Sequence, residues 1–276
     1  QPLFVMPTDE EDNFVDWEGE RLNPSNANLD TAANHIIRYQ FAKPYLKGKV
    51  LDAACGAGYG TYLLAEGYDG EVHGIDIEQS AVSWATEFYH DQVNLKFHTK
   101  DIYATEFSDN TFDVVTSFET LEHLPELDGY FNELKRVTKD GGSVIFSVPD
   151  YRTNNGAGNL NKYHLNELTF DAFKEYLEKY FSSQEYYVQI IDKPSNKTKL
   201  VSFMASLLPL KVKAMLKTLL ANSSTKVRFN GRNFDELEDT YRFLFDQYRV
   251  RNINEYVESK ENSSESRYVF IAVCKN

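Results

Sequence analysis

Short apolar runs alternate with longer segments of helical periodicity along most of the chain, and this alternation constrains the fold more than any other feature. The predicted strands cover residues 49–53, 71–76, 94–99, 112–117, 143–148, 184–191 and 268–275. Helical spacing occurs at 29–46, 59–66, 79–91, 127–138 and 167–180. Strands that alternate with helices form right-handed crossovers, hence a mostly parallel sheet covered on both faces. We therefore predict an α/β fold.

The first predicted strand leads directly into a turn that contains three glycines, in the stretch VLDAACGAGYG at residues 50–60. Glycine has no Cβ, so a ligand can approach its backbone closely, and the helix that follows presents unpaired N–H groups. The next strand ends at Asp76, 20 residues beyond Gly56. A carboxylate at that place is able to accept hydrogen bonds from ribose hydroxyls. These features predict a nucleoside-bearing ligand.

Two classes of nucleoside cofactor compete for this turn. A dinucleotide fold has the pattern G-x-G-x-x-G, whereas the glycines here read G-x-G-x-G and follow Asp52. A carboxylate at Asp52 is unfavourable beside a pyrophosphate but favourable near a cationic ligand. Asp101, after the third strand, is placed to accept from an adenine amino group. The pattern favours S-adenosylmethionine, which carries a sulfonium and an ammonium group and no phosphate.

Five motifs in order extend this interpretation. They are VLDAACGAGYG, GIDIEQSAVSWA, KDI, FDVVTSFETLEHLP and LKRVTKDGGSVIFSVPD. Together they resemble the class I S-adenosylmethionine-dependent methyltransferases, from residue 49 to about 180 and over the last two strands. The resemblance implies a Rossmann-like, seven-stranded, mostly parallel sheet, with an antiparallel last strand inserted between strands five and six.

The resemblance also implies roles for individual residues at the cofactor site. The loop from Ala54 to Gly58, with Cys55 and Gly56, would surround the methionine part. Asp76 would hold the ribose, Ile77 would lie on the adenine, and Asp101 with Ile102 would bind the adenine edge. Phe118 and Glu119 would line the side of the methyl donor. The other residues that we expect to contribute to cofactor binding are Asp52, Arg38 and Tyr39, the last two from a helix that would close over the cofactor.

His123 and His164 are the candidate catalytic residues. A hydroxyl acceptor must lose its proton as it attacks the methyl group, and histidine titrates in the range that suits this step. His123 follows the fourth strand and His164 follows the polar loop after the fifth. The alternative for each is a structural role, and Glu122 is a candidate for orienting an acceptor. Because the six histidines are scattered along the sequence, we expect no metal site.

The acceptor is less well defined than the cofactor. The stretches SFETLEHL, SVPD and YHLNEL resemble bacterial methyltransferases of glycan and sugar biosynthesis. This resemblance implies a small or sugar-like acceptor methylated at a hydroxyl. Methylation of a quinone, lipid or other natural product at carbon or nitrogen is an alternative within the class. Outside it, a nicotinamide-dependent oxidoreductase and a binding module without activity remain open.

Charge is distributed unevenly. The chain has a net charge of −13, which argues against nucleic acid as a partner, because affinity for phosphate backbones comes from Lys and Arg. The segment 193–230 nevertheless has eight basic residues and no acidic one, with apolar residues at helical spacing. Peripheral contact with a membrane, a homodimer contact and a cap over the acceptor are the alternatives for this segment.

The chain is expected to divide into three regions. Residues 1–46 form a lead-in and a capping helix, 47–191 with 267–276 form the methyltransferase domain, and 192–266 form a helical insertion that includes an aromatic-rich helix at 233–256. The N-terminus has no signal-peptide pattern, no stretch has the length of a membrane span, and only two cysteines are present. We therefore expect a cytoplasmic protein.

Overall fold

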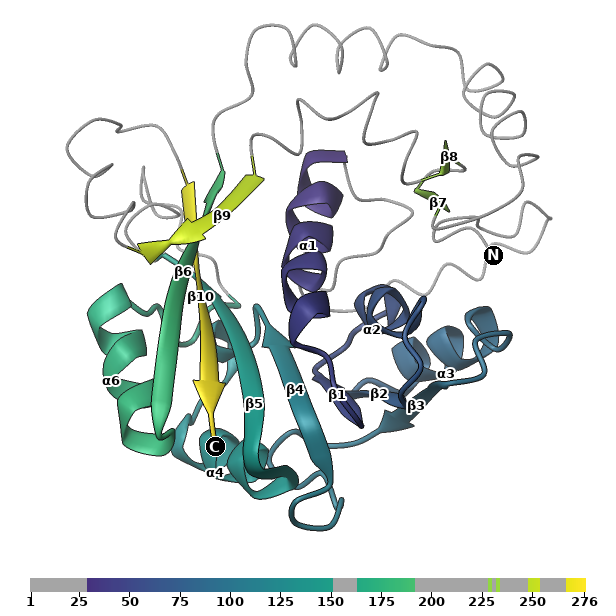
Figure 1. Cartoon of the computed structure of the whole chain (residues 1–276), viewed down its shortest axis with the longest axis horizontal. Helices are drawn as coiled ribbons and strands as arrows, with labels where there is room; N and C mark the ends of the chain where they lie inside the picture. Colours follow the sequence, from purple (N-terminus) through teal and green to yellow (C-terminus); the bar gives the residue numbers. More distant parts are fainter. Residues whose placement is uncertain (1–28, 151–162, 192–227, 230–231, 234–247, 254–266) are drawn as a thin grey trace, which may run out of the picture.

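An eight-stranded sheet forms the centre of the protein (Figure 1). The computed structural model describes residues 29–150, 163–191, 228–229, 232–233, 248–253 and 267–276. The strands of the sheet are β1 (Val50–Ala53), β2 (Val72–Asp76), β3 (Leu95–Thr99), β4 (Phe112–Phe118), β5 (Thr138–Pro149), β6 (Ser183–Ile191), β9 (Tyr248–Asn252) and β10 (Arg267–Lys275). Their order is β3-β2-β1-β4-β5-β10-β6-β9. A separate antiparallel pair joins β7 (Arg228–Phe229) to β8 (Arg232–Asn233).

The strand directions confirm the predicted topology. The strands β3, β2, β1, β4 and β5 are parallel neighbours, and β10 lies antiparallel between β5 and β6. The eighth strand was not expected: β9 pairs antiparallel with the outer edge of β6. The helix predicted at 233–256 is therefore wrong for residues 248–252, and also for residue 233, which lies in β8. The sequence of that stretch, YRVRN, alternates large and basic side chains, which suits an edge strand.

Helices cover both faces of the sheet. The helices α1 (Leu29–Ala42), α2 (Tyr59–Ala65) and α3 (Gln79–Phe88) share one core cluster with the sheet, whereas α4 (Asp128–Val137) and α6 (Phe170–Tyr180) share the other (Figure 1). The alternation along β10 shows why both layers form. Phe270 and Ala272 lie in the cluster with α4 and α6, and Ile271 and Val273 lie in the cluster with α1 to α3. Each large apolar side chain buried in this way contributes roughly 1.5–3 kcal/mol to stability.

Local sequence fixes where the helices begin and end. The Glu78 carboxylate accepts a hydrogen bond from the N–H of Ser80 and caps α3, and the Thr169 hydroxyl accepts from the N–H of Ala172 and caps α6. The helix α1 ends at Ala42, before the predicted end at residue 46, and a 3₁₀ turn (Lys43–Tyr45) follows. Pro44 lies in that turn and is unable to donate to a continuing helix.

The fold places the functional turns together. Because β1, β2, β3 and β4 are parallel neighbours, the turns that follow them lie along one edge of the sheet. These turns contain most of the residues expected to bind a ligand.

Among the described residues, none of the helices combines the length and the apolar character of a membrane span. The segment 193–227 lies outside the described residues, so its proposed roles stay predictions, as do the three predicted regions.

Candidate functional site

The three glycines between β1 and α2 have different surroundings. A Cβ added at Gly56 would meet no atom of the described residues within 4 Å, so these residues leave the space beside its backbone open. At Gly58 it would lie 2.6 Å from the ring of Phe97, and at Gly60 it would lie 1.9 Å from the ring of Tyr39. Gly58 and Gly60 are therefore required by packing inside the protein. Of the three glycines, only Gly56 offers bare backbone to a ligand. The sequence led us to expect this of the whole turn, so the expectation holds for one glycine instead of three.

Asp76 connects this turn to the next one. Its Oδ2 accepts from the N–H of Gly56 at 2.8 Å, and its Oδ1 accepts from the N–H of Glu78 at 2.9 Å. A carboxylate oxygen can accept more than one hydrogen bond, so these contacts are compatible with a further bond from a ligand hydroxyl. The next side chain, Ile77, lies in the bend after β2 and is 65% exposed. A carboxylate and an apolar surface thus lie side by side next to the open space at Gly56.

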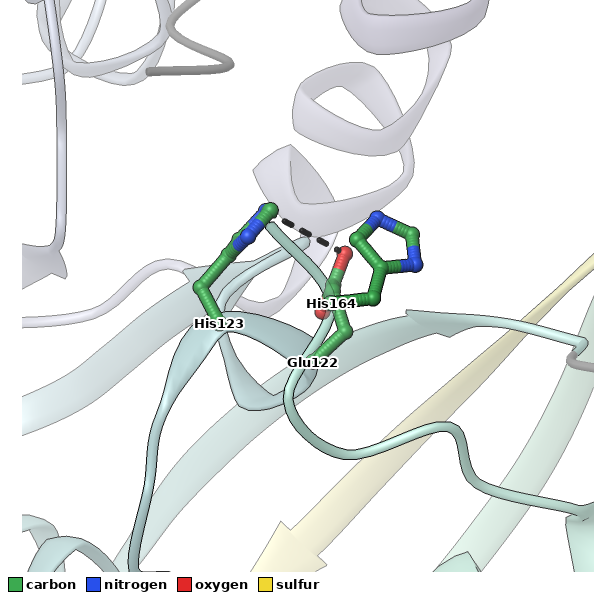
Figure 2. Close-up of side chains that lie close together, drawn as sticks. All are labelled: Glu122, His123 and His164. Atoms are coloured by element: carbon green, nitrogen blue, oxygen red, sulfur yellow. Dashed lines mark ion pairs between the residues drawn. The ribbon is translucent and has the colours of Figure 1, made fainter. Parts of the chain in front are cut away.

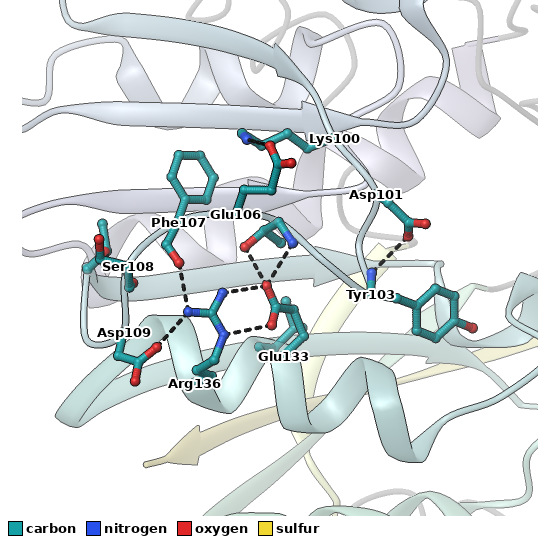
Figure 3. Close-up of polar contacts among 12 residues, drawn as sticks. Lys100, Asp101, Tyr103, Glu106, Phe107, Ser108, Asp109, Glu133 and Arg136 are labelled. Atoms are coloured by element: carbon teal, nitrogen blue, oxygen red, sulfur yellow. Dashed lines mark hydrogen bonds and ion pairs between the residues drawn. The ribbon is translucent and has the colours of Figure 1, made fainter.

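The loop after β3 contributes Asp101 and Ile102. The exposed Asp101 carboxylate accepts from the N–H of Tyr103 at 2.9 Å (Figure 3). Ile102 is partly buried against the core. Figure 3 shows how α4 anchors the same loop. Glu133 accepts from the N–H and the hydroxyl of Thr105 at 2.7 and 2.6 Å, and Arg136 donates to the carbonyl of Phe107 at 2.7 Å. The loop that presents Asp101 is therefore held by buried contacts on its inner side.

Ala54 and Cys55 form the start of the glycine turn. Ala54 has a φ of +60°, a left-handed conformation that costs an L-residue free energy. The N–H of Cys55 donates to the carbonyl of Ile75 at 2.8 Å, which joins the turn to β2. Its thiol is buried, and burial raises the thiol pKa well above its ordinary value. The thiol is therefore not exposed to a ligand, and the Cys55 carbonyl accepts from the N–H of Gly58 at 3.0 Å, so both backbone groups of Cys55 are bonded within the protein.

Asp52 is enclosed within the protein. The side chain is 1% exposed, and its carboxylate accepts from the hydroxyls of Tyr39, Thr61 and Thr116 at 3.3, 2.8 and 2.8 Å. Burial raises its pKa to about 6, against the opposing effect of the three hydroxyls. Asp52 thus lies inside the protein and not at the surface of the glycine turn. Sequence reasoning missed the hydroxyls, because they come from adjacent helices and a neighbouring strand.

The raised pKa of Asp52 predicts a pH-dependent stability. Between pH 4 and pH 6 the folded state binds more protons at this group than the unfolded state does, so stability falls as the pH rises through this window. Relative to Asp52→Asn, which lacks the titration, the wild-type free energy of unfolding should fall by up to about 3 kcal/mol. Urea unfolding of both proteins at pH 4, 5, 6 and 7 measures this difference. A difference that stays constant or rises with pH contradicts the assignment.

Arg38 and Tyr39 come from α1 and lie inside the protein. Arg38 has no exposed surface; its Nη1 donates to Gln189 at 3.1 Å and to Asn34 at 3.3 Å, and its Nη2 lies 3.8 Å from Glu119 Oε2. Among the described residues, Nε and Nη2 make no hydrogen bond. These two nitrogens form one bidentate edge of the guanidinium, the kind of edge that carboxylates bind. Sequence reasoning missed Gln189, which lies on a distant strand.

Phe118 and Glu119 form the end of β4 and its turn. Phe118 packs edge-on against Tyr39, with ring centroids 5.0 Å apart and planes at 76°. Glu119 has a φ of +50°. The Ser147 hydroxyl accepts from the N–H of Glu119 at 3.1 Å and donates to its Oε1 at 2.8 Å, so it fixes the turn and the carboxylate together. Ser147 was not predicted, although a serine near the end of an apolar strand is a usable signal.

The fold brings His123 and His164 together, with Glu122 beside them (Figure 2). The imidazole centroids are 5.1 Å apart at 79°, and His123 Nε2 lies 3.9 Å from Glu122 Oε1. One ligand atom from each of the three side chains lies within 4.8 Å of the others, a group able to hold a metal ion. We expected no metal site because the histidines are scattered along the sequence. For His123 and His164 that reason no longer applies, because the fold brings them together.

These features define the class of protein. The sheet is open and mostly parallel, with a late antiparallel strand. The turn after β1 has a bare glycine, and β2 ends in a carboxylate. This combination is typical of nucleoside-binding α/β proteins. A family model described as a methyltransferase domain matches residues 47–206. The chain therefore belongs to the S-adenosylmethionine-dependent methyltransferase domain family, whose cofactor is S-adenosylmethionine.

Similar proteins of known name match part of the chain. Phosphoethanolamine N-methyltransferase 3 of Arabidopsis thaliana is 36% identical over 104 residues, which are 37% of this chain and 21% of that protein. The 2-methyl-6-phytyl-1,4-hydroquinone methyltransferase of Synechocystis sp. is 41% identical over 96 residues, which are 35% of this chain and 30% of that protein. The chain thus spans about a fifth to a third of the length of these relatives.

A solved structure extends the likeness to the whole fold. Phosphoethanolamine N-methyltransferase 2 of Haemonchus contortus, in complex with S-adenosyl-L-methionine, superposes with a TM-score of 0.51 at 18% identity, over 93% of this chain and 54% of that chain. At this identity the likeness concerns the fold alone. The expected likeness to glycan and sugar methyltransferases is not supported, because the relatives above are named for phosphoethanolamine and a hydroquinone. Membership in a methyltransferase family also argues against the nicotinamide-dependent alternative.

Proposed function

We propose that this chain transfers the methyl group of S-adenosylmethionine to a hydroxyl of a small-molecule acceptor. The observation that carries the proposal is the open space at Gly56, bordered by the Asp76 carboxylate and the exposed side chain of Ile77. In a family that uses this cofactor, such a surface matches a ribose with its adenine. The acceptor would enter from the side of the turn after β4.

Each part of the cofactor has a proposed contact. The Asp76 carboxylate accepts from the ribose hydroxyls, Ile77 covers one face of the adenine, and Asp101 with Ile102 binds the adenine edge. The backbone of residues 54–58 follows the methionine part, and Phe118 with Glu119 borders the methyl group. The paired Nε and Nη2 of the buried Arg38 bind the methionine carboxylate. The charges of Asp52 and Glu119 favour the cationic donor over its neutral product.

The chemistry requires alignment and removal of one proton. Transfer is an in-line displacement in which the acceptor oxygen forms a bond to the methyl carbon as the carbon–sulfur bond breaks and the electrons pass to sulfur. Holding the reactants in line contributes on the order of 7–11 kcal/mol. The acceptor proton leaves toward the imidazole pair of His123 and His164, which stand in the segments after β4 and β5. Activation of this proton contributes about 10²–10⁴-fold to the rate.

Gly56 provides a test with a matched control. The Cβ of Gly56→Ala enters the space proposed for the cofactor, so the affinity for S-adenosylhomocysteine should fall about tenfold or more, equivalent to roughly 1.4 kcal/mol. Gly67→Ala introduces the same left-handed strain, with φ of +69° against +53°, and its Cβ also meets no atom within 4 Å among the residues that the structure describes. Gly67 follows the far end of α2, so its variant should bind normally in titration calorimetry. Equal affinities of both variants and the wild type would count against the proposed site.

The acceptor is tested by transfer of labelled methyl groups. The full chain is incubated with labelled S-adenosylmethionine and with a hydroquinone, a free sugar or phosphoethanolamine. Label on a hydroxyl oxygen supports the proposal, and the hydroquinone and the sugar distinguish the two kinds of hydroxyl. Label on nitrogen or on ring carbon supports the alternative within the class. The cytoplasmic location and a homodimer stay predictions.

A further inference from the structure

We propose that Glu122, His123 and His164 bind a divalent transition-metal ion, with Zn²⁺ as the best fit. Two imidazoles and one carboxylate are donors that Zn²⁺ accepts, and imidazole suits transition metals better than it suits Mg²⁺ or Ca²⁺. The catalytic role of the ion rests on the proposed function, because the ion would bind the acceptor hydroxyl. As a binding site it stands on the geometry of the three side chains alone.

The ligand atoms must approach one another to bind one ion. The three ligand atoms lie within 4.8 Å of one another. Two ligand atoms that bind one tetrahedral ion, each at roughly 2.0–2.2 Å, lie about 3.3–3.6 Å apart, so the most distant pair must close by roughly 1.5 Å at most. Both imidazoles are half-buried, whereas the Glu122 side chain is only 3% exposed. Closing the site therefore requires the imidazoles and the buried carboxylate to approach one another, and Figure 2 shows the Glu122 carboxylate between the two imidazoles.

The hydrogen bond of His123 prepares it as a ligand. Its Nδ1 lies 3.2 Å from the carbonyl oxygen of Tyr163, and a carbonyl only accepts, so Nδ1 carries the proton. The lone pair is therefore on Nε2, the nitrogen that lies 3.9 Å from Glu122 Oε1. A ring N–H bound to a backbone carbonyl is the usual outer contact of a metal-binding histidine. The tautomer is thus set for a metal at Nε2.

Backbone contacts hold the two ligand segments together. The Glu122 carbonyl accepts from the N–H groups of Leu165 and Asn166 at 2.6 and 3.0 Å, and the Asn166 side chain donates to the carbonyl of Leu124. The residues that follow His164 are therefore fastened to the turn that contains Glu122 and His123. The cluster is part of the fold, rather than a chance meeting of surface side chains.

Three protein ligands leave coordination positions open, as in catalytic metal sites. An acceptor hydroxyl bound there becomes more acidic, as a metal-bound water does when its pKa falls to about 7. The hydroxyl loses its proton to solvent, its oxygen bonds to the methyl carbon, and the carbon–sulfur bond breaks with its electrons on sulfur. In this arrangement His123 and His164 act as ligands, so the ion takes the place of a histidine base.

Zn²⁺ titration of the chelator-treated full chain tests the site. Calorimetry and metal analysis after dialysis should find one ion per chain, and Glu122→Gln and His164→Gln should each weaken binding at least tenfold. His90→Gln is the matched control, because His90 is exposed and lies 3.0 Å from the Asp91 carboxylate, without a second imidazole in a metal-binding group among the described residues. Its Zn²⁺ affinity should equal that of the wild type. The absorption of bound Co²⁺ should change only in the first two variants.

Several results would overturn the proposal. They are absence of stoichiometric binding, equal binding by all variants, and a preference for Mg²⁺ over Zn²⁺. Circular dichroism and binding of S-adenosylhomocysteine show that each variant is folded, and a variant that fails these checks is replaced by Glu122→Asp or His164→Asn. Cofactor binding without Zn²⁺ binding refutes the metal site and leaves the proposed function. Zn²⁺ binding without cofactor binding refutes the proposed function and leaves the metal site.

Discussion

Asp76→Asn should weaken the binding of S-adenosylhomocysteine roughly a hundredfold or more. The carboxylate that accepts from the N–H groups of Gly56 and Glu78 is, in our proposal, also the acceptor for the ribose hydroxyls. Hydrogen bonds to a charged group contribute about 1.5–3 kcal/mol each, so the loss of two costs about 3–6 kcal/mol. In addition, the amide nitrogen of the introduced Asn would replace one carboxylate oxygen and face the backbone N–H of Gly56 or Glu78, which would then lack its acceptor. Titration calorimetry measures the effect.

Asp113→Asn is the control for this substitution. Asp113 also accepts from a backbone N–H, that of Lys49 at 2.8 Å, but lies at the start of β4 and thus at the opposite edge of the sheet. The substitution there removes a similar interaction without touching the proposed site. We expect normal cofactor affinity from this variant. Equal losses in the two variants would mean that Asp76 acts only through general stability.

Arg38→Met should reduce the affinity for S-adenosylhomocysteine roughly ten- to a hundredfold, since a charged hydrogen-bonding contact is worth about 1.5–3 kcal/mol. Arg38 is fully buried, and two of its nitrogens have no hydrogen-bond partner among the described residues. Buried polar atoms without partners are rare in native proteins and require a reason. In our proposal, binding of the methionine carboxylate supplies that reason.

The ligand itself provides the control for Arg38. Methylthioadenosine has the nucleoside and the sulfur but no carboxylate, so Arg38→Met should bind it as well as the wild type does. Loss of affinity for both ligands would instead indicate that Arg38 supports the fold through Gln189 and Asn34. Thermal unfolding of the same variant measures that structural contribution directly.

Much of the fold was predictable from the sequence, because apolar runs and helical spacing are local properties. The seven predicted strands are present, and the antiparallel insertion of β10 agrees with the resemblance. The strand β9 could not be predicted, because its conformation depends on the edge of β6, with which it pairs. The helix α1 is shorter than its periodicity suggests, because Pro44 acts on the residues before it.

The parts of the candidate site that come from one βαβ unit were predictable from the sequence. The parts that depend on contacts between distant segments were not. Gly56 and Asp76 follow from the pattern of a single βαβ unit, and they are joined by a hydrogen bond. The packing role of Gly60 depends on Tyr39 from another helix. The approach of His164 to His123 depends on backbone hydrogen bonds between segments that lie far apart in the sequence, which spacing cannot indicate.

A crystal structure of the full chain grown with S-adenosylhomocysteine provides the sharpest test of the proposed cofactor site. We expect the nucleoside to lie along the backbone at Gly56, with both ribose hydroxyls on the Asp76 carboxylate and the adenine against Ile77. A nucleoside bound elsewhere on the protein, or a site that stays empty in crystals saturated with the ligand, would contradict this assignment.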